Sequence, residues 1–240
     1  MSGDSSRSRG VVIAIDGPAA AGKSSTALRV AQHLGFRHID SGALYRAATA
    51  AQVREEADAS RWTESSVLAA AEAVTLVARD TSFAPCIGGA DAQEEIRSAG
   101  VTRHVSRVAQ MPRVRSWVNA RVRALAGEYD VVVDGRDMGT AVFPDAAVKI
   151  FLVADSWERA RRRLVERLSR SPADAEIADE TARLAHRDAR DATQTLQARD
   201  AIVIDTTHLT QTEQVHRIVA LVEAALARPG GISAEPRTGE

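Results

Sequence analysis

The chain has 240 residues with 45% hydrophobic content, and 31 basic residues against 32 acidic ones give a net charge of −1. This length allows one sizeable α/β core, and the balanced charge excludes a global electrostatic field for nucleic acid or anionic membranes. Cys86 is the only cysteine, which excludes an intramolecular disulfide and favours a reducing compartment. We expect a cytoplasmic monomer that binds neither membranes nor nucleic acid.

Apolar runs of strand length alternate with helical patterns. Strands are predicted at 11–15, 36–40, 130–133, 148–153 and 201–205, and helices at 23–34, 42–54, 156–170 and 210–227. Continuous apolar runs are typical of parallel strands whose two faces are both covered by helices. The pattern therefore predicts an α/β fold with a ligand site at the carboxyl ends of the strands. A further helical region spans 101–126.

Two stretches interrupt this alternation. Residues 57–100 combine an Ala-rich helical stretch, two strand-like runs and Gly88-Gly89, which predicts a small insert with hairpin character. Residues 156–198 are helical and dense in Arg and Asp, which predicts two antiparallel helices that form a mobile lid. We expect one domain over 11–227, with flexible tails at 1–10 and 228–240.

Residues 17–24 read Gly-Pro-Ala-Ala-Ala-Gly-Lys-Ser between a predicted strand and a predicted helix. This pattern is typical of a loop that cradles nucleotide phosphates. Gly17 and Gly22 let backbone N–H groups converge on an anion, Lys23 meets the β- and γ-phosphates, and Ser24 offers a hydroxyl to Mg²⁺. We expect ATP as phosphoryl donor together with Mg²⁺. The predicted donor contacts in this loop are Gly17, Ala20, Ala21, Gly22, Lys23, Ser24 and Ser25.

Polar motifs follow two further strands. Asp40-Ser41-Gly42 leads to Tyr45-Arg46, although a capped helix with a surface arginine explains these residues equally well. The second motif is Asp134-Gly135-Arg136-Asp137-Met138-Gly139-Thr140, in which Asp134 has the Walker-B-like place of a carboxylate near the Mg²⁺ water shell. A simple turn is the alternative, but a turn does not require the Arg-Asp pair.

Arginines crowd two helical regions. Six lie within 101–126, and the spacing of Arg159, Arg162 and Arg163 places them on one helix face. Phosphoryl transfer needs such cations, because its main task is to neutralise charge on the transferred group. A solvated helix face or a GC-rich coding bias explains the same count.

Together these residues resemble the bacterial cytidylate kinases, a family of P-loop nucleoside monophosphate kinases. The resemblance runs from Ile13 to about Ala225 and is most specific at 134–140, continuing through 142–146. Residues 106–108 and 112–115 also fit the pattern. It implies a three-layer P-loop kinase fold with a parallel central sheet, a small acceptor-binding insert and a helical lid. The implied reaction transfers the γ-phosphoryl group of ATP to CMP or dCMP.

The resemblance also implies residue roles. Lys23, Arg136 and Arg187 are implied in catalysis, and Arg159 and Arg163 in donor binding. Ser24 and Asp134 are the expected metal residues, with Asp134 acting through water. Arg46 and Arg136 are implied at the acceptor phosphate, Ser106, Arg115 and Asp137 at the cytosine, and Arg187 and Asp191 at the ribose. The full set of implied acceptor contacts is Ser41, Arg46, Ser106, Arg115, Arg136, Asp137, Arg187 and Asp191.

One segment departs from the family pattern. Gln194 stands where the family has a further phosphate-binding arginine, and the segment 192–200 is a few residues shorter. This departure predicts a slower kinase, unless Arg190 or Arg199 supplies the charge. It also leaves open a kinase for UMP or for a cytidylate-like intermediate of specialised metabolism. A P-loop module that binds nucleotide with little turnover is a third hypothesis.

Overall fold

A computed structural model describes residues 10–227, so the predicted tails lie outside the described residues apart from Gly10. A five-stranded parallel sheet forms its centre. The strands are β1 (Val12–Asp16), β2 (Arg37–Asp40), β6 (Val131–Asp134), β7 (Val148–Val153) and β8 (Ile202–Asp205), in the order β2-β6-β1-β7-β8. The five strands predicted from apolar runs are confirmed, with ends shifted by a residue or two.

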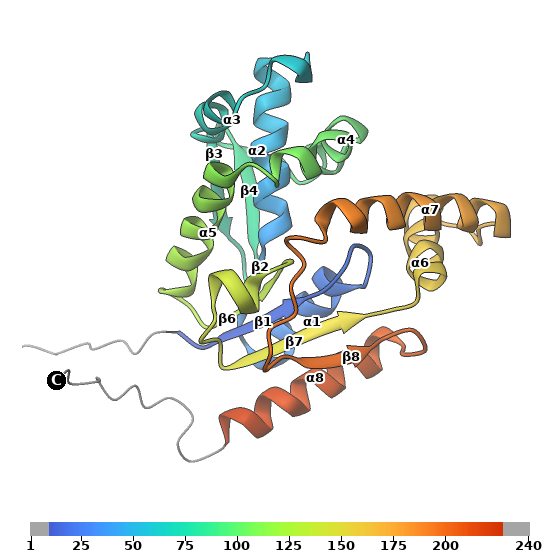
Figure 1. Cartoon of the computed structure of the whole chain (residues 1–240). Helices are drawn as coiled ribbons and strands as arrows, with labels where there is room; N and C mark the ends of the chain where they lie inside the picture. The colour runs from blue at the N-terminus through green and yellow to red at the C-terminus, as the bar shows by residue number, and fades with distance from the viewer. Residues whose placement is uncertain (1–9, 228–240) are drawn as a thin grey trace, which may run out of the picture.

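Helices cover both faces of this sheet (Figure 1). Ile13 and Ile15 of β1 pack into one core with α1 (Lys23–Leu34) and α8 (Gln211–Leu226). Ala14, which points to the opposite face, packs into a second core with α2 (Ser41–Glu55) and α5 (Pro112–Ala126). Side chains alternate between the two faces of a strand, so one apolar run serves two helical layers. The predicted three-layer α/β architecture is confirmed.

The insert continues from the end of α2. It contains η1 (Ala59–Arg61), α3 (Glu64–Ala71), β3 (Val74–Ala78), β4 (Phe83–Ile87), β5 (Ala90–Asp91) and η2 (Glu95–Arg97). β3, β4 and β5 form an antiparallel sheet, in which Gly88 and Gly89 take positive φ values of 62° and 83° at the turn. The hairpin prediction is confirmed, and the short β5 is an addition to it. The amide of His38 in β2 donates to the Thr81 carbonyl at 2.8 Å, which joins the insert to the central sheet.

The helical region predicted over 101–126 is confirmed, and the structure divides it into two helices. α4 (Ala99–Val108) ends before Met111, and Pro112 takes the first position of α5. Proline has no backbone N–H, so it cannot continue a preceding helix. At the first position of a helix this absence costs nothing, because an N–H there has no acceptor within the helix. The break lets α4 and α5 run in different directions, and each carries one residue of the predicted acceptor site.

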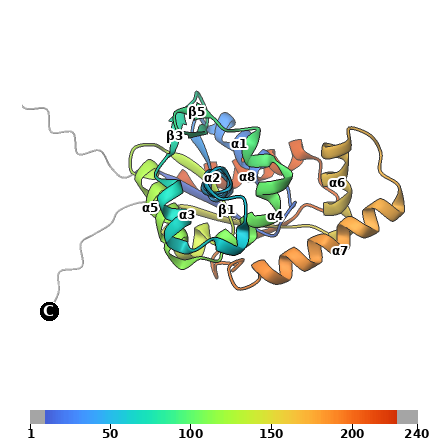
Figure 2. The ribbon, with the colours of Figure 1, turned by 90° about the horizontal axis from the view of Figure 1, so that it is seen from above.

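α6 (Ser156–Leu168) and α7 (Asp174–Asp191) project together from one side of the sheet, as the view from above shows (Figure 2). α6 ends at Ser169, whose φ is 53°. Arg163 of α6 pairs with Glu180 of α7, and Arg170 pairs with Glu176, so the partners run in opposite order along the chain, as in a helical hairpin. Within residues 10–227, no helix is both long and apolar enough to cross a membrane.

Candidate active site

The P-loop lies between β1 and α1, and its geometry requires glycine. Gly17 and Gly22 have φ values of 148° and 83°, and a Cβ on Gly17 would lie 2.3 Å from the Leu152 carbonyl oxygen. No side chain caps the first turn of α1, so its N–H groups stay available to an anion. The ammonium of Lys23 donates to the Pro18 carbonyl oxygen at 2.7 Å. The loop thus holds its lysine against its own backbone.

Lys23 is buried, and burial has a strong electrostatic effect on it. Burial and, to a smaller extent, the charge of Arg136 lower the pKa of Lys23 to about 7, although Asp134 and Asp16 oppose the shift. A buried cation with too little negative charge around it attracts an anionic ligand. The local charge therefore favours a phosphate group above this loop.

Ser24 and Asp134 form the predicted metal pair. The Ser24 hydroxyl donates to one oxygen of Asp134 at 2.7 Å, and Nε2 of His38 lies 2.7 Å from the other. Burial alone would raise the pKa of Asp134, but the hydrogen bond and charge of His38, with Lys23 and Ser24, bring that pKa below its usual value. An ionised carboxylate beside a hydroxyl is the oxygen donor set that Mg²⁺ prefers. The two residues therefore fit a magnesium ion bound through water.

His38 is part of this site, although its spacing to other residues gave it no predicted role. Its side chain is buried, and burial lowers its pKa while the hydrogen bond and charge of Asp134 raise it, with a net rise. The sequence did carry a signal for this role. His38 lies inside a predicted strand of a sheet covered on both faces, so its side chain should be buried, and buried polar side chains need hydrogen-bond partners.

Asp16, at the end of β1, holds the loop that follows β6. Its carboxylate accepts hydrogen bonds from the amides of Met138 at 2.8 Å and Gly139 at 2.7 Å. Burial raises the pKa of Asp16 to about 6, although these two amides oppose the rise. Met138 begins the π-helical turn η3 (Met138–Val142), and the Ser41 hydroxyl donates to the Asp134 carbonyl at 2.8 Å. These bonds fix the loop that carries Arg136 and Asp137.

Arg115 and Asp137 form the centre of the predicted base site. The two side chains make an ion pair through Nη2 of Arg115. Arg115 also lies 6.0 Å from the ring centroid of Tyr45, whose buried hydroxyl has no hydrogen-bond partner within residues 10–227. Burial raises the pKa of Tyr45 to about 12. Ser106 is buried on α4, and its hydroxyl bonds to none of the other predicted site residues in the described part of the chain.

Four arginines with different predicted roles affect one another electrostatically and form an arginine cluster, defined as Arg46, Arg136, Arg163 and Arg187. Asp191 lies 3.7 Å from Arg136 and 3.6 Å from Arg187. Burial, together with the charges of the other three arginines, lowers the pKa of Arg187 to about 10, although the charge of Asp191 opposes the shift. The buried Nε of Arg187 has no hydrogen-bond partner among the described residues. The cluster therefore has more positive charge than its surroundings balance.

Arg46 and Arg136 are held in this cluster by backbone carbonyls and by one hydroxyl. Arg46 donates to the Ile96 carbonyl and the Thr102 hydroxyl, both at 3.1 Å, and Arg136 donates to the Gly17 carbonyl at 3.2 Å. The Arg46–Ile96 hydrogen bond connects the cluster to the insert, and the Arg136–Gly17 hydrogen bond connects it to the P-loop.

The helical hairpin α6–α7 contacts the P-loop through Arg159. This buried side chain donates to the Ala19 carbonyl at 2.9 Å and to Asp188 at 2.7 Å, and the Ala19 amide donates back to Asp188 at 3.4 Å. Arg163 pairs with the buried Glu180 at 2.9 Å. Arg159 thus joins the P-loop to α7, and Arg163 joins α6 to α7.

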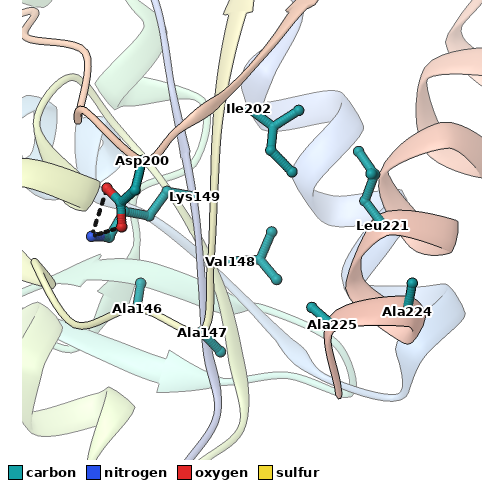
Figure 3. A pocket seen from close by; sticks show the side chains of 9 residues that line it. All are labelled: Ala146, Ala147, Val148, Lys149, Asp200, Ile202, Leu221, Ala224 and Ala225. Atoms are coloured by element: carbon teal, nitrogen blue, oxygen red, sulfur yellow. Dashed lines mark hydrogen bonds and ion pairs between the residues drawn. The ribbon is translucent and has the colours of Figure 1, made fainter. Parts of the chain in front are cut away.

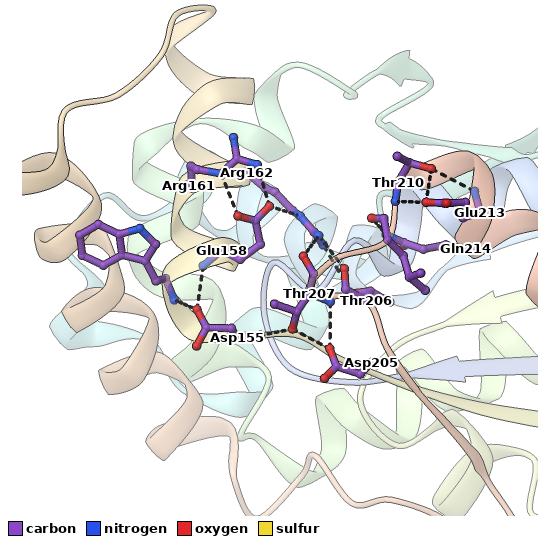
Figure 4. A network of polar contacts seen from close by, with 12 residues as sticks. Asp155, Glu158, Arg161, Arg162, Asp205, Thr206, Thr207, Thr210, Glu213 and Gln214 are labelled. Atoms are coloured by element: carbon purple, nitrogen blue, oxygen red, sulfur yellow. Dashed lines mark hydrogen bonds and ion pairs between the residues drawn. The ribbon is translucent and has the colours of Figure 1, made fainter.

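Arg162 points elsewhere, so the prediction that it shares a face with Arg159 and Arg163 is wrong. It donates to the carbonyls of Thr206 at 2.6 Å and Thr207 at 3.0 Å and pairs with Glu158 at 2.9 Å (Figure 4). The backbone carbonyls after β8 draw this side chain toward the sheet. Arg162 therefore fastens the base of α6 to the turn before α8.

Comparison with known sequences identifies the family of this chain. The family model described as cytidylate kinase matches residues 13–224. A cytidylate kinase of Limosilactobacillus fermentum is 40% identical over 91% of this chain and 98% of its own length, and one of Geobacillus kaustophilus is 44% identical over 89% and 97%. A bifunctional pantoate ligase/cytidylate kinase of a Synechococcus strain is 40% identical over 95% of this chain and 43% of its own length. The chain belongs to the cytidylate kinase family.

Proposed function

We propose that this chain transfers the γ-phosphoryl group of ATP to CMP or dCMP, giving CDP or dCDP. One observation carries the proposal: the P-loop lysine and the arginine cluster act on one another electrostatically across one site. Lys23 is affected by the charges of Arg136 and Arg187, and Arg187 is affected in turn by Arg46 and Arg163. Such an excess of positive charge suits two phosphate-bearing nucleotides that meet end to end.

On the donor side, Lys23 leaves the Pro18 carbonyl and meets the β- and γ-phosphates. Ser24 and Asp134 would hold Mg²⁺, which would supply positive charge to neutralise the phosphates of the donor. We assign to Arg159 a contact with the donor nucleotide as α6 and α7 close, and its bonds to Ala19 and Asp188 support this role. We assign the lid to 156–198 and its closure to the exclusion of water.

On the acceptor side, Asp137 accepts a hydrogen bond from the exocyclic amine of cytosine, and Arg115 and Ser106 donate to its O2/N3 edge. Arg46 and Arg136 take the acceptor phosphate, with Ser41 beside them. Asp191 and Arg187 take the ribose hydroxyls. The insert at 57–100 belongs to this side, since its Ile96 carbonyl holds Arg46 at 3.1 Å.

The chemistry needs no covalent intermediate. The residues hold the two nucleotides in line, and Lys23, Arg136 and Arg187 meet the charge that develops on the transferred group. We further propose a cytoplasmic monomer that uses small nucleotides and neither nucleic acid nor membranes. The balanced charge and the single, buried Cys86 support this part of the proposal.

An acceptor panel tests the function. ADP release is measured at fixed ATP and Mg²⁺ with CMP, dCMP, UMP and AMP, and with no acceptor as the control. We expect release that depends on CMP and dCMP. Release with UMP alone would identify a kinase for another acceptor. Tight ATP binding without acceptor-dependent release would identify a nucleotide-binding module, and either result contradicts the proposal.

A further inference from the structure

Residues 192–201 connect α7 to β8 in a short segment whose two ends are fixed. At its start, the Asp191 carbonyl accepts hydrogen bonds from the amides of Gln194 and Thr195, both at 2.9 Å. At its end, Asp200 pairs with the buried ammonium of Lys149 at 2.7 Å and 3.0 Å (Figure 3). Lys149 also donates to the Pro144 carbonyl. These bonds hold both ends of the segment in this structure.

Gln194 is directed to the predicted base site. Its side-chain oxygen accepts a hydrogen bond from Nη1 of Arg115 at 3.0 Å. The same Nη1 donates to the Ala109 carbonyl at 3.1 Å, and Nη2 pairs with Asp137. Three acceptors thus hold one guanidinium group, whose side chain is 18% exposed. Gln194 supplies the acceptor that comes from the α7 side of the site.

This contact gives position 194 a role other than that of a missing phosphate cation. An arginine in the same backbone position would bring a second guanidinium toward Arg115, and like charges at such separations repel. A glutamine offers an oxygen instead, which a guanidinium needs, because Arg has donors and no acceptor. Gln194 therefore supplies a hydrogen-bond acceptor to the Arg115 guanidinium, which has only donors.

We propose that Gln194 is a positioning residue that sets the preference for cytosine over uracil, an inference that rests on the proposed kinase function. Gln194 and Ala109 fix the guanidinium of Arg115. Arg115 in turn holds one carboxylate oxygen of Asp137, so the carboxylate keeps one orientation. Cytosine presents an amine donor to that carboxylate, whereas uracil presents a carbonyl oxygen at the same place, which a carboxylate repels. Loss of the Gln194 contact frees Arg115 and, with it, Asp137.

The test compares Gln194→Ala with Gln194→Glu and with a matched control, Gln197→Ala. Gln197 is exposed in the same segment, and its side chain has no hydrogen bond among the described residues. We expect Gln194→Ala to raise the KM for CMP about tenfold and to lower the CMP-to-UMP ratio of kcat/KM by a similar factor, the scale of one hydrogen bond to a charged group. The KM for ATP stays within about twofold. Gln194→Glu keeps an oxygen acceptor and stays within about threefold of wild type, and Gln197→Ala is unchanged.

The outcomes separate this inference from the function on which it rests. Wild-type protein that phosphorylates no pyrimidine monophosphate overturns the proposed function and this inference together. A CMP-selective wild type whose Gln194→Ala variant keeps full selectivity, with an unchanged thermal midpoint, overturns the inference alone. Gln194→Arg provides a further arm: a gain in turnover of about tenfold or more would show that the position lacks a phosphate cation, against the inference.

Discussion

The proposed donor and acceptor sides of this site are built in different ways. The donor cradle is one run of eight residues, 17–24, between β1 and α1. The acceptor side takes residues from α2, α4, α5, the loop after β6 and α7, and its contacts join distant positions, such as Arg115 to Gln194 across 79 residues. A contiguous cradle depends on local backbone geometry, whereas a dispersed one depends on packing. Donor-side substitutions should therefore act locally, and acceptor-side substitutions should also affect their hydrogen-bond partners.

The largest effect is expected on the donor side, at Lys23. We expect Lys23→Met to lower phosphoryl transfer about 10²–10³-fold, because a charge preorganised for the transition state is lost while the loop backbone remains. Steady-state ADP release measures the loss, and circular dichroism checks the fold. Turnover within a few fold of wild type would contradict the P-loop assignment.

The Lys23→Met variant also tests how the folding stability depends on pH. The pKa of Lys23 falls from 10.5 to about 7 on folding, so the folded state binds fewer protons between these values. Wild type should therefore gain stability as the pH rises from about 7 toward 10. Lys23→Met removes that gain, and thermal midpoints at pH 7 and pH 9.5 measure it. An equal pH dependence in both proteins would show that the lysine is charged in the fold.

Asp137→Ala tests the acceptor side. We expect kcat/KM for CMP to fall ten- to hundredfold with little change in the KM for ATP, since an unpaired buried amine costs about 1–3 kcal/mol. The variant also leaves Arg115 without its ion pair. Asp80→Ala, at an exposed position of the insert, is the control. A parallel rise in both Michaelis constants would assign Asp137 a structural role and weaken the contrast between the two sides.

Asp16 connects the two sides, because it lies at the end of β1 and binds the acceptor loop. Asp16→Asn replaces one of two acceptor oxygens with a donor that faces a backbone amide, so we expect a loss of about 1–3 kcal/mol in the free energy of unfolding. Folding raises the pKa of Asp16 from 3.8 to about 6. Its stabilisation is therefore full below pH 4 and is lost as the pH rises through 6. Denaturant titrations at pH 4.5 and pH 7 should show this slope in wild type and not in the variant.

The same contrast explains what the sequence could predict. The P-loop and the five strands follow from local patterns, because turn glycines and apolar runs act over a few residues. The bonds from Asp16 to Gly139 and from His38 to Asp134 join neighbouring strands or their ends, and no spacing in one chain encodes them. Gln194 likewise contacts Arg115, a residue 79 positions away in the chain. Residue types at the site were therefore predictable, while their partners required the fold.

The smallest effects are expected at two arginines outside the cluster. Arg190 and Arg199 are exposed, and neither side chain has a hydrogen bond or ion pair within residues 10–227. Exposed charges are screened by water and salt, so Arg190→Ala and Arg199→Ala should leave the KM for CMP and kcat within about twofold.

Arg163→Ala is the comparison, because Arg163 belongs to the arginine cluster and is held by Glu180 at 2.9 Å. Its loss should lower kcat about tenfold, the scale of one charge-assisted contact. A crippled Arg190→Ala or Arg199→Ala variant would instead mean that the lid carries an exposed arginine into the site on closure, and that the arginine cluster seen here is incomplete.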